Sequence, residues 1–197
     1  MRLKWILSAS VLSIVMGSTP ALAAECHGMV YPDKESIDSE EHVLNGMGLR
    51  EGTAMKVDVY VAALYLNGLE NSAETILSSV APKKLVLKFL RKVSKGQISK
   101  AWVKGLKKTA GSKARDLEDR MAQLNSWMTD LNTGSTLNFS FLPEANPVSQ
   151  LIVELNGEIK GIITGDDFIV PFLSIWLGER PAVNKGLKAG LLGGTCP

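Results

Sequence analysis

The sequence contains few of the residues and motifs from which catalytic and metal sites are built. Only two histidines, His27 and His42, occur in 197 residues, and they lack the spacing of the zinc-binding His-Glu-x-x-His motif. The glycine patterns of P-loops, dinucleotide-binding turns and nucleophile elbows do not occur either. We therefore predict no catalytic residue, no metal site and no cofactor, and we interpret both histidines as surface residues.

Long apolar runs are confined to the N-terminus. The run over residues 5–16 follows two basic residues and is shorter than the roughly 20 residues that span a bilayer. The small residues of Ala21-Leu22-Ala23 fit a signal-peptidase site. We interpret residues 1–23 as a secretory signal peptide, with an uncleaved anchor as the alternative. Residues 24–197 then form a single domain that is periplasmic or secreted.

Neither sign of charge is in excess. Removing Arg2 and Lys4 with the signal peptide leaves 20 basic residues against 20 acidic ones, which argues against a nucleic-acid-binding protein. The basic residues are clustered, however, because residues 83–115 hold 12 of them and no acidic residue. Two interpretations stay open: a solvated helix face balanced by the acidic segment 25–42, or a surface that attracts anionic lipid or an anionic ligand.

Cysteine is almost absent. Cys26 and Cys196 lie near the two ends of the exported chain, and two cysteines in an exported protein most simply form one disulfide. Closing so long a loop contributes about 4–5 kcal/mol in the chain-entropy treatment. Two free thiols are the alternative.

The hydrophobic pattern predicts an α+β domain. Residues 57–66 alternate between two mostly apolar faces, which indicates a central strand covered on both sides. Residues 25–42 are predicted to be an extended arm and residues 45–48 a turn. The other predicted elements are a helix near 72–80, a strand over 84–93, a helix through Ile98, Trp102 and Leu106, a helix over 113–131, strands over 136–142, 150–155 and 158–164, and helices over 166–177 and 181–191. Segregated strands and helices favour a largely antiparallel sheet.

Two polar features need interpretation. Arg50 follows the glycine-rich segment, and Tyr60 lies on the apolar strand after it. An arginine and a tyrosine aimed into an apolar cavity would hold one carboxylate by charge-assisted hydrogen bonds, whereas a surface position is the alternative for Arg50. We interpret Asp166-Asp167 as the acidic start of a helix rather than as a catalytic carboxylate pair.

Three segments resemble the chalcone isomerase-like superfamily, most closely its bacterial exported members. They are Asn45-Gly46-Met47-Gly48-Leu49-Arg50 with the strand at 56–66, the strand at 85–94, and Ile175-Trp176-Leu177-Gly178. The resemblance implies an open-faced β-sandwich, in which a layer of helices packs on a large antiparallel sheet with a ligand cleft between them. The superfamily includes plant enzymes that cyclise chalcones to flavanones, and non-catalytic members that bind fatty acids in the same cleft.

The resemblance carries over residue by residue. Arg50 matches an arginine that steadies the phenolate in the enzymes and meets the carboxylate in the fatty-acid binders. Tyr60 falls where the enzymes carry a threonine, and the binders pair a tyrosine with the arginine. The enzymes also place a tyrosine and an asparagine on the first long helix, where this sequence has Ile98 and Gly105. Neither residue forms side-chain hydrogen bonds, which argues against isomerase activity.

The resemblance thus implies a non-catalytic periplasmic protein that binds a fatty acid or a similar amphipathic carboxylate. Arg50 and Tyr60 are expected to hold the carboxylate, and the tail site is expected to be lined by Ala62, Leu64, Trp102 and Leu106. One alternative is an isomerase acting on a chalcone-like phenolic ligand. A second is an envelope interaction protein whose basic surface contacts an anionic membrane or a partner.

Overall fold

The computed structural model describes residues 23–52, 56–142, 149–194 and 196. The strands are β1 (Ala23–Cys26), β2 (Met29–Pro32), β3 (Lys34–Ile37), β4 (Glu40–Glu51), β5 (Asp58–Leu66), β6 (Lys83–Phe89), β7 (Thr136–Leu142), β8 (Gln150–Leu155) and β9 (Glu158–Thr164). The helices are α1 (Ala73–Ser78), α2 (Lys95–Ala110), the 3-10 helix η1 (Gly111–Leu117), α3 (Glu118–Ser126), α4 (Asp166–Leu177) and α5 (Lys185–Leu191).

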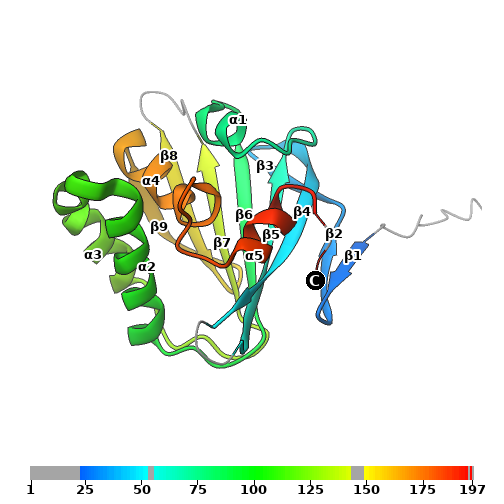
Figure 1. The fold of residues 1–197 in the computed structure, drawn as a ribbon, viewed down its shortest axis with the longest axis horizontal. Helices are drawn as coiled ribbons and strands as arrows, with labels where there is room; N and C mark the ends of the chain where they lie inside the picture. The colour runs from blue at the N-terminus through cyan, green and yellow to red at the C-terminus, as the bar shows by residue number, and fades with distance from the viewer. Residues whose placement is uncertain (1–22, 53–55, 143–148, 195, 197) are drawn as a thin grey trace, which may run out of the picture.

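Seven antiparallel strands form one sheet in the order β3-β4-β5-β6-β7-β8-β9. Helices cover one face of this sheet, and the separate β1–β2 hairpin lies on its other side (Figure 1). The predicted α+β class with an antiparallel sheet is therefore confirmed. None of the helices in the described residues combines the length and apolarity needed to cross a membrane.

Strand β5 lies at the centre of both apolar cores, as its two apolar faces predict. Ala62 and Leu64 belong to the core beneath the helices. Val61 and Ala63, on the alternate face, pack in a smaller core beneath the β1–β2 hairpin. Because all four side chains are fully buried, the strand is covered on both sides, and its register fixes which side chains face the helices.

The structure differs from the N-terminal prediction in three respects. Residues 25–42 are extended as predicted, but they pair in strands β1 to β4 instead of forming an arm, and residues 45–48 are not a turn but lie within the 12-residue strand β4. The glycines there serve close packing: a Cβ at Gly46 or Gly48 would lie 2.1 or 2.4 Å from a carbonyl oxygen of helix α5. His42, predicted to be on the surface, is fully buried.

The boundaries of two predicted helices also differ. The stripe over 113–131 is buried as expected, but helix α3 ends at Ser126, because Leu131 pairs instead with Val93 in an isolated β-bridge. The last helix begins at Lys185 rather than at Pro181, since the amide of Ala182 donates to Ile175 O and holds the preceding segment outside the helix.

The predicted disulfide between Cys26 and Cys196 is confirmed. It joins the end of β1 to the segment that follows α5, and thus ties the N-terminal hairpin to the C-terminal segment. The predicted signal peptide stays a prediction, because residues 1–22 lie outside the described residues.

Lys83 leads to a testable pH dependence. Its side chain is almost fully buried, Nζ donates to Ser79 O and Ala81 O, and burial lowers the pKa of Lys83 to about 8. Between this value and the ordinary 10.5 the unfolded chain binds more protons, so the free energy of unfolding should rise with pH, by at most about 1.4 kcal/mol per pH unit for one proton. Denaturant unfolding at pH 8–10 measures this slope.

The control for this prediction is Lys83→Met, which should show a flatter slope whatever its absolute stability. Equal slopes for the two proteins would contradict the assignment. Above about pH 10 the sign reverses, because burial raises the pKa values of Tyr31 and Tyr60, so the unfolded chain releases protons that the folded one retains. The window of the measurement therefore ends there.

Candidate ligand-binding cavity

A cavity of about 500 Å³ lies between the sheet and the helix layer. Its walls come from the ends of β4 and β5, the segment after β6, the first turns of α2, the last turn of α4 and the segment before α5. Most of the lining is apolar: Val57, Val59, Val93, Ile98, Ala101, Trp102, Ile175, Trp176, Ala182 and Val183. This size and character are typical of small-molecule sites.

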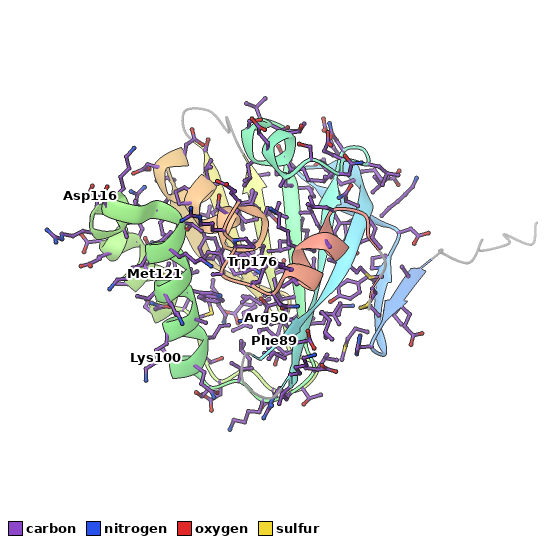
Figure 2. The ribbon with its side chains drawn as sticks, in the orientation of Figure 1. Arg50, Phe89, Lys100, Asp116, Met121 and Trp176 are labelled. Carbon is purple, nitrogen blue, oxygen red and sulfur yellow. A yellow bond between two sulfur atoms is a disulfide. The ribbon has the colours of Figure 1, made fainter. Side chains whose placement is uncertain are left out.

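The close packing of α5 on β4 explains how Arg50 reaches the cavity. Gly48 and Arg50 are two positions apart and share a face of β4. Because Gly48 lacks a side chain, α5 lies directly on the strand. Arg50 comes next on that face, close to Asn184, the residue immediately before α5. Figure 2 shows the labels of Arg50, Phe89 and Trp176 close together in the middle of the view, and the Arg50 side chain is half-buried.

The guanidinium of Arg50 is anchored but not neutralised. Its Nη1 donates to Glu51 O (2.8 Å) and to Asn184 Oδ1 (3.3 Å), and Asn184 in turn donates to Leu49 O. Among the described residues, no carboxylate lies within ion-pair distance of Arg50, and its Nε and Nη2 form no hydrogen bond. A guanidinium has five N–H donors, so the unused donors are available to an anionic ligand.

Tyr60 lies directly opposite Arg50 in the sheet register. Its hydroxyl oxygen accepts a hydrogen bond from Trp176 Nε1 (3.1 Å), and its ring packs edge-on against Phe89. Burial raises the pKa of Tyr60 to about 12, although the charge of Arg50 and the bond from Trp176 oppose the shift. The hydroxyl is therefore neutral at physiological pH and keeps its proton to donate to a ligand.

The structure brings only some of the predicted site residues together. Arg50, Tyr60 and Trp102 line the cavity. Ala62 and Leu64 do not, because the strand continues from Tyr60 into the packed core. Leu106, one turn beyond Trp102 on α2, is also in the core and borders a separate hollow between α2 and α3.

Several lining residues were missed from the sequence. The alternation over 57–66 predicts that Val57 and Val59 lie on the face opposite Tyr60. They nevertheless reach the cavity at the irregular start of β5, where the register shifts between Arg50 and Glu51. Trp176 lies on a helix that is apolar on most sides. Neither periodicity nor composition distinguishes its cavity-facing position, and the only signal is a buried indole N–H that needs a partner.

Ile98 and Gly105 stand where the enzymes of the superfamily have a tyrosine and an asparagine, and both have apolar surroundings. Ile98 lines the cavity wall. Gly105 is buried against α4, and a Cβ there would lie 3.1 Å from the Ile175 side chain. Neither position presents a polar side chain to the cavity, whose polar lining residues are Arg50, Tyr60, Arg91, Lys92 and Gln97.

Comparison with known proteins agrees with this architecture. The sequence profile of the family described as chalcone isomerase-like matches residues 23–193. The fold is similar to the crystal structure of the Arabidopsis thaliana fatty-acid binding protein AtFAP1, with a TM-score of 0.67 and 16% identity over 84% of this chain and 92% of that one. No curated protein sequence matches the chain. The expected sheet-and-helix-layer fold is confirmed, and the chain belongs to the chalcone isomerase-like family.

Proposed function

We propose that this chain is a non-catalytic binding protein for a fatty acid or a similar amphipathic carboxylate. The observation that carries the proposal is a guanidinium without an acidic partner among the described residues, beside a neutral tyrosine hydroxyl, in the wall of a mostly apolar cavity. Arg50 and Tyr60 hold the carboxylate, and the tail lies against the apolar walls. The similarity to a fatty-acid binding protein supports this assignment.

The two parts of the ligand contribute differently to affinity. Burying the tail contributes about 0.8 kcal/mol per CH₂ group, whereas a hydrogen bond to a charged group contributes about 1.5–3 kcal/mol. Affinity is therefore dominated by the tail, and the carboxylate fixes which end of the ligand lies at Arg50.

The predicted export completes the proposal. The disulfide between Cys26 and Cys196 supports a periplasmic or secreted location, because such bonds persist in oxidising compartments.

The decisive experiment compares a long-chain fatty acid with its methyl ester, using calorimetric titration of wild type and Arg50→Gln. In wild type the acid should bind about 10- to 100-fold more tightly than the ester, because only the acid offers a charge-assisted bond. In Arg50→Gln this preference should disappear while ester affinity changes little. Arg115→Gln, an exposed change on η1 away from the cavity, is the matched control.

Two results would contradict the proposal. One is the absence of measurable binding for fatty acids of any chain length. The other is an unchanged acid-over-ester preference in Arg50→Gln, which would show that the carboxylate lies elsewhere.

The isomerase alternative is decided by the loss of chalcone absorbance in the presence of the protein. We expect no acceleration over the uncatalysed reaction, because Ile98 and Gly105 occupy the positions that matched the enzymes' polar pair. Turnover that disappears in Arg50→Gln would instead establish the enzyme activity.

A further inference from the structure

Helix α2 exposes a row of lysines beside the cavity. The helix contains five lysines and no acidic residue. Lys100, Lys104, Lys107 and Lys108 are all exposed and recur at helical spacing, so they share one side of the helix. We call these four residues the α2 cationic face. Figure 2 shows the labelled Lys100 on the outer side of the molecule.

The charge of this face is not neutralised within the described part of the chain. None of its lysines forms an ion pair there, and only Lys108 has a hydrogen bond, to Pro181 O. The acidic N-terminal segment pairs with other lysines, through Glu35 with Lys84 and Glu41 with Lys34. Figure 1 shows β1 and β2 at the opposite end of the molecule from α2. The acidic segment 25–42 therefore balances Lys84 of the basic cluster, but it does not balance the lysines of α2.

The cationic face borders the opening of the cavity. Gln97 and Ala101 are exposed residues of α2 that line the cavity. Lys100 lies three positions after Gln97, and Lys108 lies seven positions after Ala101. Such spacings place residues on the same side of a helix, so the lysines lie next to the cavity-lining residues of α2. The exposed Arg91, just before α2, also lines the cavity. A surface in contact with these lysines would therefore meet the cavity opening.

We propose that the α2 cationic face docks the protein on an anionic lipid bilayer, with the cavity opening toward the lipid. The occupant is a membrane surface because the feature is a row of flexible, hydrated ammonium groups, suited to a field of phosphate headgroups. An amphipathic carboxylate then passes between bilayer and cavity without crossing bulk water. This last step rests on the proposed function, whereas the docking itself does not.

The experiment measures partition of the full exported chain onto phosphatidylcholine vesicles with and without one part in three phosphatidylglycerol. Binding should require phosphatidylglycerol and weaken steeply with salt. Lys100→Gln/Lys104→Gln should weaken it on the order of 30-fold, since each basic residue near an anionic surface contributes about a fivefold factor. The matched control, Lys34→Gln/Lys160→Gln, removes the same charge from β3 and β9 and should bind as wild type.

A second measurement follows transfer of a fluorescent fatty acid from the vesicles to the protein. Transfer from anionic vesicles should be faster for wild type than for Lys100→Gln/Lys104→Gln, while affinity for the same ligand in solution is equal, because neither lysine lines the cavity.

The two proposals fail in distinguishable ways. Salt-independent vesicle binding, no binding, or equal loss in both double variants overturns the docking, even when fatty acid binds in solution. Failure of fatty-acid binding with intact, lysine-dependent vesicle binding overturns the proposed function and the transfer step, and leaves the docking supported.

Discussion

Ala101→Trp is expected to raise the Kd for a long-chain fatty acid by about two orders of magnitude or more. Ala101 lines the cavity yet is exposed at the surface of α2, so a large side chain there occupies tail space without displacing core residues. Excluding three or four methylene groups removes about 3 kcal/mol at 0.8 kcal/mol each, which is roughly 100-fold in affinity. Calorimetric titration measures the change directly.

The tail-site prediction needs controls for both the fold and the location. Ala182→Trp enters the same cavity from the segment between α4 and α5 and should have a similar effect. Ala122→Trp makes the same exchange at an exposed position of α3 outside the cavity, and its affinity should equal that of wild type. Wild-type affinity in both cavity variants would show that the tail binds outside this cavity.

The comparison of these variants with Arg50→Gln separates the two contributions to binding. Cavity variants should weaken the acid and its methyl ester equally, because both carry the same tail. Arg50→Gln should weaken only the acid. If the charge supplied most of the affinity, Arg50→Gln would weaken binding of the acid more than the cavity variants do.

The sheet and its two-sided core were predictable from the sequence because burial imposes a period of two on strands. The alternation over 57–66 alone indicated that β5 is central and covered on both sides. Helix α4 was equally predictable, since its start at Asp166 and its end at Gly178 both carry ordinary boundary signals.

Strand β4 was not predictable over residues 45–48, because glycine occurs both in turns and where a helix packs closely on a strand. Gly46 and Gly48 have the composition of a turn, but they permit the close approach of α5 to β4. Contacts between residues more than 130 positions apart leave no local pattern. The contact between α5 and β4, which positions Arg50, could therefore not be predicted from the residues around Gly46 and Gly48.

Two polar residues of the site, Arg50 and Tyr60, were predictable from the sequence, whereas Arg91, Lys92, Gln97 and most of the apolar lining were not. Arg50 and Tyr60 stand out because a cation and a phenol beside an apolar strand need partners. Apolar lining residues are chemically the same as core residues, so Val59 and Trp176 differ from Leu64 only by where the helices leave space. That space depends on the register shift at the start of β5, which local sequence does not specify.

Loss of the disulfide is expected to be the largest single effect on stability. The bond closes a loop with a sequence separation of 170, for which the chain-entropy treatment gives about 5 kcal/mol. For a chain of this size that corresponds to a Tm lower by roughly 10–20 °C. Cys26→Ser/Cys196→Ser compared with wild type by thermal unfolding tests the value.

The variant should nevertheless fold, because the hairpin has other anchors on the sheet. Tyr31 is fully buried and donates from its hydroxyl to Val61 O, and Tyr65 donates to Pro32 O. The cavity residues lie on the opposite face of the sheet, so fatty-acid affinity at a temperature where the variant is folded should equal that of wild type. Reduced affinity there would mean that the hairpin and the cavity are coupled.

Reduced wild type separates the two physical origins of the loss. Reduction breaks the covalent link but leaves both cysteine side chains in place, whereas Cys26→Ser also puts a hydroxyl into the small core beneath the hairpin. If the link acts through the unfolded chain, reduced wild type should lose most of the stability that the variant loses. If only the variant is destabilised, the loss belongs to packing at Cys26, and the entropic explanation fails.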